Sequence, residues 1–273
     1  MMEYDNNTTS VTMLVREKNK DDEHIEKVLS KVCNKKMILT SSNVSQTMGF
    51  VLNEYKTAPK YDVIFGSAGA PKFQNKVSGD SYSFIKLGSD KVLFALCDGM
   101  GSGNNAQKTS ETAMSLIENF YRAGFDNETI ISSVNRFLTL KSDDNYSALD
   151  MCVIDLKDST ADFIKVGAPE GFIKHKDLVE IMPAGALPLG ILDEMKPVLS
   201  SKLLNNNDMV VLTTDGVIDA FEGIDNLKKY INNLTTTNPQ IMANTIIDEA
   251  MLLSKNEPKD DCTIICLRVF NRV

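Results

Sequence analysis

The chain has 273 residues, of which 42% are hydrophobic, and a formal net charge of −8 at pH 7. This length allows one large core without help from disulfides or metals. The acidic balance excludes a broad surface for phosphate backbones, so no nucleic-acid partner is expected. The five cysteines form no CxxC pair, and no apolar run is long enough to cross a bilayer. We therefore predict no zinc ribbon and no membrane segment.

Residues 1–57 are predicted to form a leader that differs in composition from the rest of the chain. Residues 1–22 are rich in Asn, Thr, Asp and Lys, and we expect them to be frayed or partly ordered. The stretch "DDEHIEKVLSKVC" then spaces Ile25, Val28, Leu29 and Val32 along one side of a helix and carries acidic residues in its first turn. We interpret 1–57 as a candidate regulatory segment with one short amphipathic helix.

From about Tyr61 the sequence changes to short apolar runs separated by Gly, Asp and Asn. Several neighbouring runs are joined by only two to five turn residues, as in "IDLKDSTADF", which favours hairpins and antiparallel pairing over parallel crossovers. We predict a strand in each of "YDVIFG", "SYSFIKLG", "KVLFALC", "LDMCVIDL", "ADFIKVG", "EGFIKH", "LVEIMP", "DMVVLTT" and "CTIICLRVF".

Helical spacing interrupts these strands in three places. It is found in residues 104–124, which end at Gly124, in 126–138, and in 238–255, which begin with Asn238 as N-cap and Pro239 in the first turn. Strands in two sheets with helices outside them make an α/β fold. For residues 58–273 we predict an α-β-β-α sandwich of two mostly antiparallel sheets flanked by helices.

Acidic residues recur where predicted strands begin or end. Strand ends on one edge of a sandwich can meet, although like charges that meet raise one another's pKa and need a cation or a shared proton. Carboxylate oxygens suit Mg²⁺ or Mn²⁺, and Gly99 and Gly101 would let the main chain approach such an ion. The acidic residues are Asp80 in "VSGDSYS", Asp98 in "ALCDGMGSG", Asp215 in "VVLTTDGV", and Asp260 with Asp261 in "KDDCTIICL".

Each of these signals also has a plainer interpretation. Asp-Gly is the commonest hairpin-turn dipeptide, so either "DG" alone would indicate a turn. Asp80 alone would indicate a turn or a cap, and "KDD" alone a solvated loop. It is the order and spacing of all of them that favours a common site. His24 and His175 have no partner motif, and we interpret both as solvated residues without a role.

Taken together, seven stretches resemble the metal-dependent serine/threonine phosphatases of the PPM type, in the bacterial branch typified by stage II sporulation protein E. The resemblance implies two Mn²⁺ or Mg²⁺ ions, with Asp98 bridging both, the carbonyl of Gly99 on one, and Asp215 and Asp260 completing the other. Asp80 would act through bound water. The stretches are, in order, "SGDSY", "ALCDGMGSG", "LDMCVIDL", "FIKVGAPEGFI", "LPLGIL", "TTDGVIDAF" and "KDDCTIICL".

The resemblance also implies a function. The expected activity is hydrolysis of phosphoserine or phosphothreonine on a phosphorylated STAS-domain protein of the anti-anti-sigma type, in the control of a sporulation sigma factor. A cytosolic location is expected, either as a soluble relative or as the cytosolic part of a membrane-anchored protein, with a homodimer through the helices. The alternative is a catalytically silent relative that binds phosphoprotein or acts as a scaffold.

The sequence departs from the eukaryotic members of the family at two points. Met100 stands where those members carry a His after the metal-loop "DG", and "KFQNKVSGDS" holds no Arg where they place a phosphate-binding Arg. Met is usual at this position in the sporulation branch. We therefore interpret Met100 as a marker of that branch and expect activity to be retained.

Overall fold

The computed structural model describes residues 2–5, 8–101, 103–140, 146–192 and 196–272. It divides into two compact units, one of residues 1–60 with 88–90 and one of residues 61–87 with 91–273. The sequence placed the boundary between residues 57 and 58. The chain leaves the first unit slightly later, because the backbone N–H of Ala58 still donates to the carbonyl of Lys36 at 2.7 Å.

The first unit is a four-stranded antiparallel sheet with one helix. The expectation that residues 1–22 are frayed or partly ordered is wrong for Thr8–Arg16, because these residues form β2, in which Val15 is buried and Val11 lies in a small core with Met37 and Tyr55. The predicted helix is confirmed as α1 (Glu23–Cys33), which packs on β3. The sheet order is β1-β2-β4-β3, with β1 (Met2–Asp5), β2 (Thr8–Arg16), β3 (Met37–Val44) and β4 (Phe50–Thr57).

The second unit contains two five-stranded antiparallel sheets. Their orders are β11-β10-β13-β14-β5 and β12-β9-β8-β7-β6. All nine strands predicted in this unit are present, and β12 is an additional one that the sequence analysis missed. The strands are β5 (Tyr61–Ala70), β6 (Asp80–Leu87), β7 (Lys91–Gly99), β8 (Ser147–Asp155), β9 (Thr160–Val166), β10 (Gly171–Lys174), β11 (Val179–Met182), β12 (Val198–Leu203), β13 (Met209–Thr213) and β14 (Cys262–Asn271).

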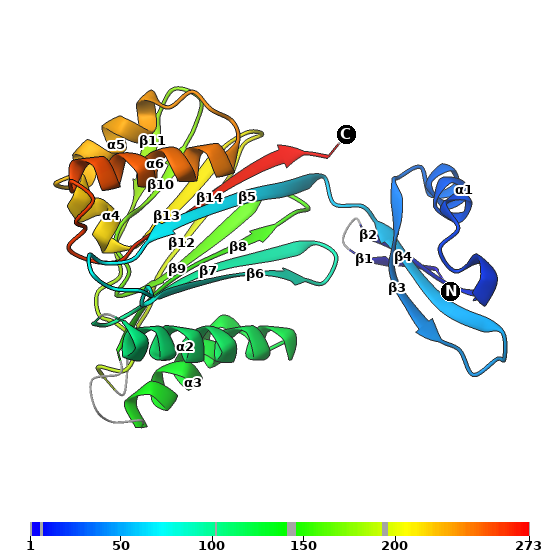
Figure 1. Cartoon of the computed structure of the whole chain (residues 1–273). Helices are drawn as coiled ribbons and strands as arrows, with labels where there is room; N and C mark the ends of the chain where they lie inside the picture. The colour runs from blue at the N-terminus through cyan, green and yellow to red at the C-terminus, as the bar shows by residue number, and fades with distance from the viewer. Residues whose placement is uncertain (1, 6–7, 102, 141–145, 193–195, 273) are drawn as a thin grey trace. The chain divides into compact units, whose positions relative to one another are not determined.

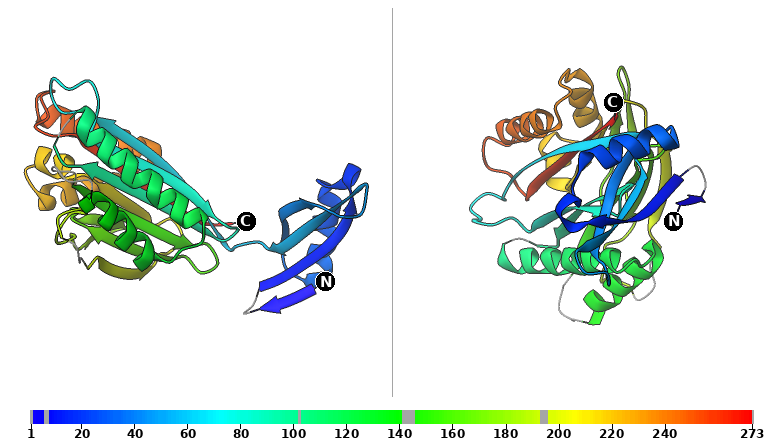
Figure 2. Two further views of the ribbon diagram at one scale, coloured as in Figure 1. Left: turned by 90° about the horizontal axis from the view of Figure 1, so that it is seen from below. Right: turned by 90° about the vertical axis from the view of Figure 1, so that its right-hand side faces the viewer.

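Helices cover the outer faces of both sheets (Figure 1). α2 (Asn104–Arg122) packs on β6 and β7 and on α3 (Asn127–Leu140). On the other side, α6 (Pro239–Leu253) packs on β5 and β14, and α5 (Ile224–Asn233) packs on β10 and β11. The short α4 (Asp215–Ala220) lies against β14. Figure 2 shows α2 running along the strands that it covers.

Three apolar layers hold this arrangement together. The layer between the sheets includes Phe94, Leu96, Leu212 and Ile265, all at most 2% exposed. The others lie between each sheet and its helices. Burial of these layers fixes the two sheets face to face, which confirms the predicted α-β-β-α sandwich and brings strand ends from both sheets to one edge. In the described part of the chain, no helix combines the length and apolar character that a membrane crossing requires.

Candidate active site

Asp80 and Asp98 form one half of the candidate site. Residues 92–97 form a buried segment of β7 that ends at Asp98, and Asp80 begins the neighbouring β6. The two aspartates are directly paired in the β6–β7 register, so their side chains lie on the same face of the sheet. Oδ2 of Asp80 accepts a hydrogen bond from the Thr214 hydroxyl at 3.1 Å.

Asp215 and Asp260 come from the other sheet. Asp215 opens α4 just after β13 ends, and Asp260 lies just before β14 begins. Because β13 and β14 are antiparallel neighbours, the end of one meets the start of the other. Two hydrogen bonds between Thr214 and Thr263 join these segments, one from N–H of Thr214 to O at 3.0 Å and one from N–H of Thr263 to Oγ1 at 2.9 Å.

Electrostatics show that these carboxylates lie near one another. Burial raises the pKa of Asp98, and the charges of Asp80, Asp215 and Asp260 raise it further. Desolvation by the surrounding protein also raises the pKa of Asp215, although its side chain is exposed, and Asp260 adds to the effect. Burial raises the pKa of Asp80 as well. The four aspartates predicted from separate parts of the sequence therefore converge at one edge of the sandwich.

Asp261 has a different position from its neighbour Asp260. Its carboxylate is buried and accepts backbone N–H groups from Lys72 at 2.7 Å and from Gly79 at 2.6 Å. It therefore holds the loop between β5 and β6, which leads to Asp80. The Asp260 carboxylate accepts the N–H of Asp261 at 2.9 Å and is partly exposed. Of the two, Asp260 is the one whose carboxylate remains open to a ligand.

The glycines of the two Asp-Gly pairs are required by packing. A Cβ on Gly99 would lie 2.1 Å from the carbonyl oxygen of Ala106 in α2, and one on Gly216 would lie 2.2 Å from that of Asp261. From the sequence, Gly99 and Gly101 were expected to let the main chain approach an ion. The structure gives Gly99 another reason, the close approach of α2. Gly101 lies in open space with a positive φ of 96°.

Sequence reasoning missed three contributors to this edge. Asp219 lies one helical turn after Asp215 in α4, and its charge also raises the pKa of Asp215. The Thr214 hydroxyl donates to Asp80, and Thr263 donates its backbone N–H to that same hydroxyl. The i, i+4 spacing in "DGVIDA" would have indicated Asp219, whereas the threonines carried no signal. A cavity of about 490 Å³ lies beside Asp260 and is also lined by Asp219, Lys255 and Lys259.

The chemistry of this edge fits hard divalent cations. In the described ranges, no three His, Cys, Asp or Glu side chains are arranged to hold a metal ion as they stand. Oδ1 of Asp80 is nevertheless buried without a hydrogen-bond partner, so it has a free acceptor position. Burial raises the pKa of the nearby Cys97 and Cys262 thiols to about 12, which keeps them protonated and leaves oxygen as the available donor. An oxygen-only set favours Mg²⁺ or Mn²⁺ over zinc.

Comparison with known proteins identifies the second unit. Residues 88–270 match the family model for stage II sporulation protein E (SpoIIE). The chain is 33% identical to stage II sporulation protein E of Bacillus subtilis (strain 168) over 220 residues, which are 79% of this chain and 27% of that protein. It is also 33% identical to the Priestia megaterium protein, over 77% of this chain and 37% of that protein. The chain thus spans only a minor part of these curated relatives.

Solved structures agree with this relationship. The phosphatase domain of B. subtilis SpoIIE superposes with a TM-score of 0.63 and 32% identity, over 79% of this chain and 95% of that chain. A structure of the PP2C phosphatase domain with a fragment of the regulatory domain gives a TM-score of 0.77 and 28% identity, over 99% of this chain and 81% of that chain. The resemblance inferred from the sequence is confirmed: the chain belongs to the stage II sporulation protein E family and contains its phosphatase domain.

Proposed function

We propose that this chain is a metal-dependent phosphoprotein phosphatase that hydrolyses phosphoserine or phosphothreonine on a small regulatory protein. The observation that carries the proposal is the convergence of Asp80, Asp98, Asp215 and Asp260 at one edge, where their charges raise the pKa of Asp98. A further relative, 24% identical over 86% of this chain and 70% of its own length, is the phosphoserine phosphatase RsbU of B. subtilis.

Asp98, Asp215 and Asp260, with the carbonyl of Gly99, would hold two Mn²⁺ or Mg²⁺ ions. A pair of such ions supplies a hydroxide at neutral pH and neutralises charge on the phosphoryl oxygens. RsbX, a protein of similar fold at a TM-score of 0.61 and 15% identity, was solved in complex with magnesium. Repulsion keeps ion-free carboxylates apart, so we expect the four aspartates to close in only when cations neutralise them.

The other residues of the edge position the ligands. Thr214 orients Asp80, which would act through bound water, and Asp261 holds the loop from Lys72 to Gly79 that carries the chain into Asp80. Lys255 and Lys259 line the cavity beside Asp260, where they offer positive charge to an incoming phosphoprotein. Met100 is exposed and has no proton to donate, so the leaving alkoxide depends on another source of protons.

The partner that we propose is a phosphorylated STAS-domain protein of the anti-anti-sigma type, in sporulation sigma-factor control. Support comes from the SpoIIE and RsbU relatives. We further propose that residues 1–57 act as a regulatory segment, since the solved structure that matches 99% of the chain includes a fragment of the SpoIIE regulatory domain. A homodimer through the helices stays a prediction. The intact set of aspartates favours an enzyme over a catalytically silent relative.

The test is release of phosphate from a phosphoserine peptide, and then from the host's phosphorylated STAS-domain proteins, with Mn²⁺ present. Asp215→Asn should reduce turnover by on the order of 10²-fold or more, because it removes a charge that neutralises the cations. The matched control is Asp248→Asn on the exposed face of α6, which should leave turnover unchanged. Absence of phosphate release with every STAS-domain protein would instead support the silent relative.

A further inference from the structure

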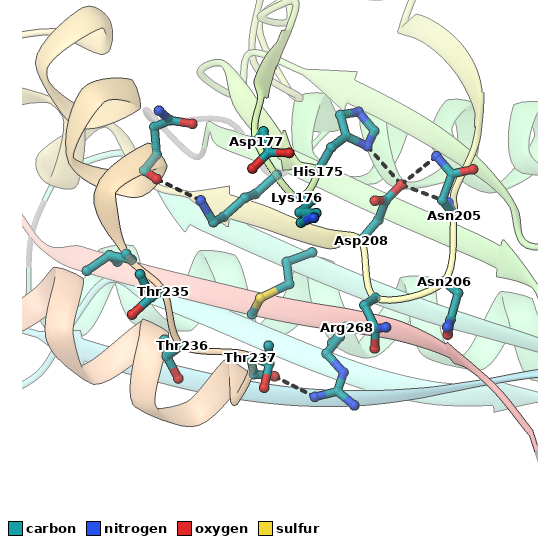
Figure 3. Close-up of a pocket in the computed structure, with 15 residues that line it drawn as sticks. His175, Lys176, Asp177, Asn205, Asn206, Asp208, Thr235, Thr236, Thr237 and Arg268 are labelled. Carbon is teal, nitrogen blue, oxygen red and sulfur yellow. Dashed lines mark hydrogen bonds and ion pairs between the residues drawn. The ribbon is translucent and has the colours of Figure 1, made fainter.

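A second cavity lies in the same unit, away from the acidic edge. Its volume is about 960 Å³. It opens where β13 begins, at Met209, whereas Asp215 follows the other end of that strand. Figure 3 shows its walls, which are the β10–β11 turn, the loop before β13, the connection between α5 and α6, and β14. The two sites therefore occupy opposite ends of the same strands.

The sheet places two cations on one face at this cavity, with Met209 between them. Lys174 of β10 is paired with Met209 of β13, and Met209 is paired with Arg268 of β14. Directly paired residues have side chains on one face, and neighbouring strands are about 4.8 Å apart, so the two basic residues lie about 10 Å apart at their Cα atoms. Lys174 extends toward the last turn of α5, and Arg268 extends toward the connection between α5 and α6.

Lys174 is a buried cation with little compensation. The residue is 8% exposed, and its ammonium donates to the carbonyl of Asn232 at 2.9 Å. No carboxylate in the described ranges forms an ion pair with it, and the exposed Asp177 only partly offsets the effect of burial on its pKa. Burial lowers the pKa of Lys174. A buried ammonium with one neutral acceptor has donor positions left for a ligand.

Arg268 also has unused donors. Its Nη1 donates to the carbonyl of Thr237 at 2.8 Å, and its guanidinium lies 5.5 Å from the centre of the Phe270 ring. Its Nε is buried and has no hydrogen-bond partner. A guanidinium carries five N–H donors, so this side chain can hold its present contact and bind an anion as well.

The main acidic group of the cavity is already satisfied. Oδ2 of Asp208 lies 2.9 Å from Nδ1 of His175 and accepts the backbone N–H of Asn205 at 2.7 Å. The interpretation of His175 as a solvated residue without a role is wrong in this respect, because it lies against a buried carboxylate from the next loop. Asp208 is therefore engaged in holding the wall together and opposes an incoming anion less than a free carboxylate would.

We propose that this cavity binds a small anionic molecule that carries phosphate or carboxylate groups. Lys174 and Arg268 bind the anionic groups, and the hydroxyl and amide side chains of 235–237 and 205–207 hydrogen-bond to the rest of the molecule. The local charge favours an anionic ligand. The chain as a whole carries a net charge of −8, whereas Lys174 and Arg268 place two positive charges on one face of this cavity. The proposal is independent of the phosphatase assignment, because no residue of the acidic edge contributes to it.

Calorimetric titration of the full chain with pyrophosphate and with citrate, in a chelating buffer, tests this proposal. Chelation leaves the acidic edge without cations, so that edge repels both probes. We expect saturable binding of at least one probe, weakened 10-fold or more in Lys174→Met and in Arg268→Met. Lys86→Met, which removes an exposed lysine on β6, should bind like the parent chain. Asp215→Asn should also bind normally, which separates this result from a failure of the phosphatase proposal.

A measurement on the unaltered chain does not depend on how the variants fold. Hydrogen exchange with and without the probe should show protection of residues 205–209 and 232–237, and no change in residues 96–99. The proposal is overturned if neither probe binds saturably, if Lys174→Met and Arg268→Met bind as tightly as the parent chain, or if the protection falls on the acidic edge instead.

Discussion

Asp80 lies directly opposite Asp98 in the antiparallel pair of β6 and β7, so the two carboxyl groups lie on the same face of the sheet. Burial and the charge of Asp80 raise the pKa of Asp98, so without cations the pair retains a proton to a higher pH than isolated carboxylates would. Metal binding would displace this proton. The pair is therefore the part of the site whose state depends most directly on pH and on metal.

The pH dependence of stability follows from the raised pKa of Asp98. A carboxyl whose pKa is higher in the folded chain than its value of about 3.9 in the unfolded chain stabilises the fold at low pH, and this contribution is lost as pH rises above 3.9 toward the folded pKa. In chelator, the Tm of the parent chain should therefore fall between pH 5 and pH 8 more steeply than that of Asp98→Asn. At pH 8 the variant should melt several degrees higher, as measured by circular dichroism.

Saturating Mn²⁺ provides the control for this comparison. It should raise the Tm of the parent chain at pH 8 and have much less effect on Asp98→Asn, because only the parent chain keeps the carboxylate that we propose would bridge two cations. Equal pH slopes for the two chains in chelator would show that Asp98 does not titrate in the proposed way.

Substitutions at Asp260 and Asp261 should affect different properties. The change at Asp260 should lower activity, and the change at Asp261 should lower stability. Asp261→Asn replaces a carboxylate that accepts two backbone N–H groups, so it should lower the free energy of unfolding by about 2 kcal/mol. Hydrogen exchange of residues 72–79 should increase with it. Asp260→Asn should leave urea unfolding in chelator nearly unchanged and reduce Mn²⁺-dependent turnover by on the order of 10²-fold. Loss of turnover in Asp261→Asn together with loss of stability in Asp260→Asn would show that Asp261 is the metal ligand.

Gly99 should tolerate no side chain. In Gly99→Ala the new Cβ would lie 2.1 Å from the Ala106 carbonyl oxygen, which is main chain and cannot rotate away. Such overpacking costs about 3 kcal/mol, to be measured by urea unfolding. The matched variant Gly101→Ala meets open space and has only its positive φ to oppose it, so it should cost about 1 kcal/mol. Equal losses would show that α2 moves away easily.

Removing one partner of the buried ion pair of Lys165 and Asp150 should destabilise the fold more than replacing both partners with apolar residues. Both side chains are 2% exposed, and Nζ of Lys165 also donates to the Pro169 carbonyl at 2.8 Å. Lys165→Met leaves Asp150 buried without its cation and should cost about 4 kcal/mol, measured by urea unfolding. The double variant Lys165→Met with Asp150→Leu should recover most of that loss. A double variant as unstable as the single one would contradict this account.

Most of the phosphatase unit could be predicted because its strands are short apolar runs with clear turns between them. The runs around Phe94 and Leu212 are buried on both faces, so composition alone identifies them. The strand β12 was missed because it is an edge strand with Leu199 and Leu203 exposed, and "VLSSKL" lacks a buried pattern. The sheet of residues 2–57 was not predicted because its many Asn and Thr residues obscure the alternation of buried positions, such as Val11 and Val15, with exposed ones.

The site was predictable only in part, for a physical reason. Aspartates at strand ends can be read from the sequence, and their order carried the family resemblance. Which groups hold them in place depends on contacts across the fold, such as that of Thr214 with Asp80, which is separated from it by 134 residues. The cavity at Lys174 and Arg268 could not be predicted from the sequence either, because only the strand register brings these two residues to one face.

The candidate site draws Asp80 and Asp98 from one sheet and Asp215 and Asp260 from the other. Any opening of the sandwich therefore separates the carboxylates before it disrupts either sheet. Cations held between them would resist that opening and couple the two halves into one cooperative unfolding unit. Purification in chelator should consequently yield a protein whose two sheets come apart more readily, and whose susceptibility to proteases reports on metal content.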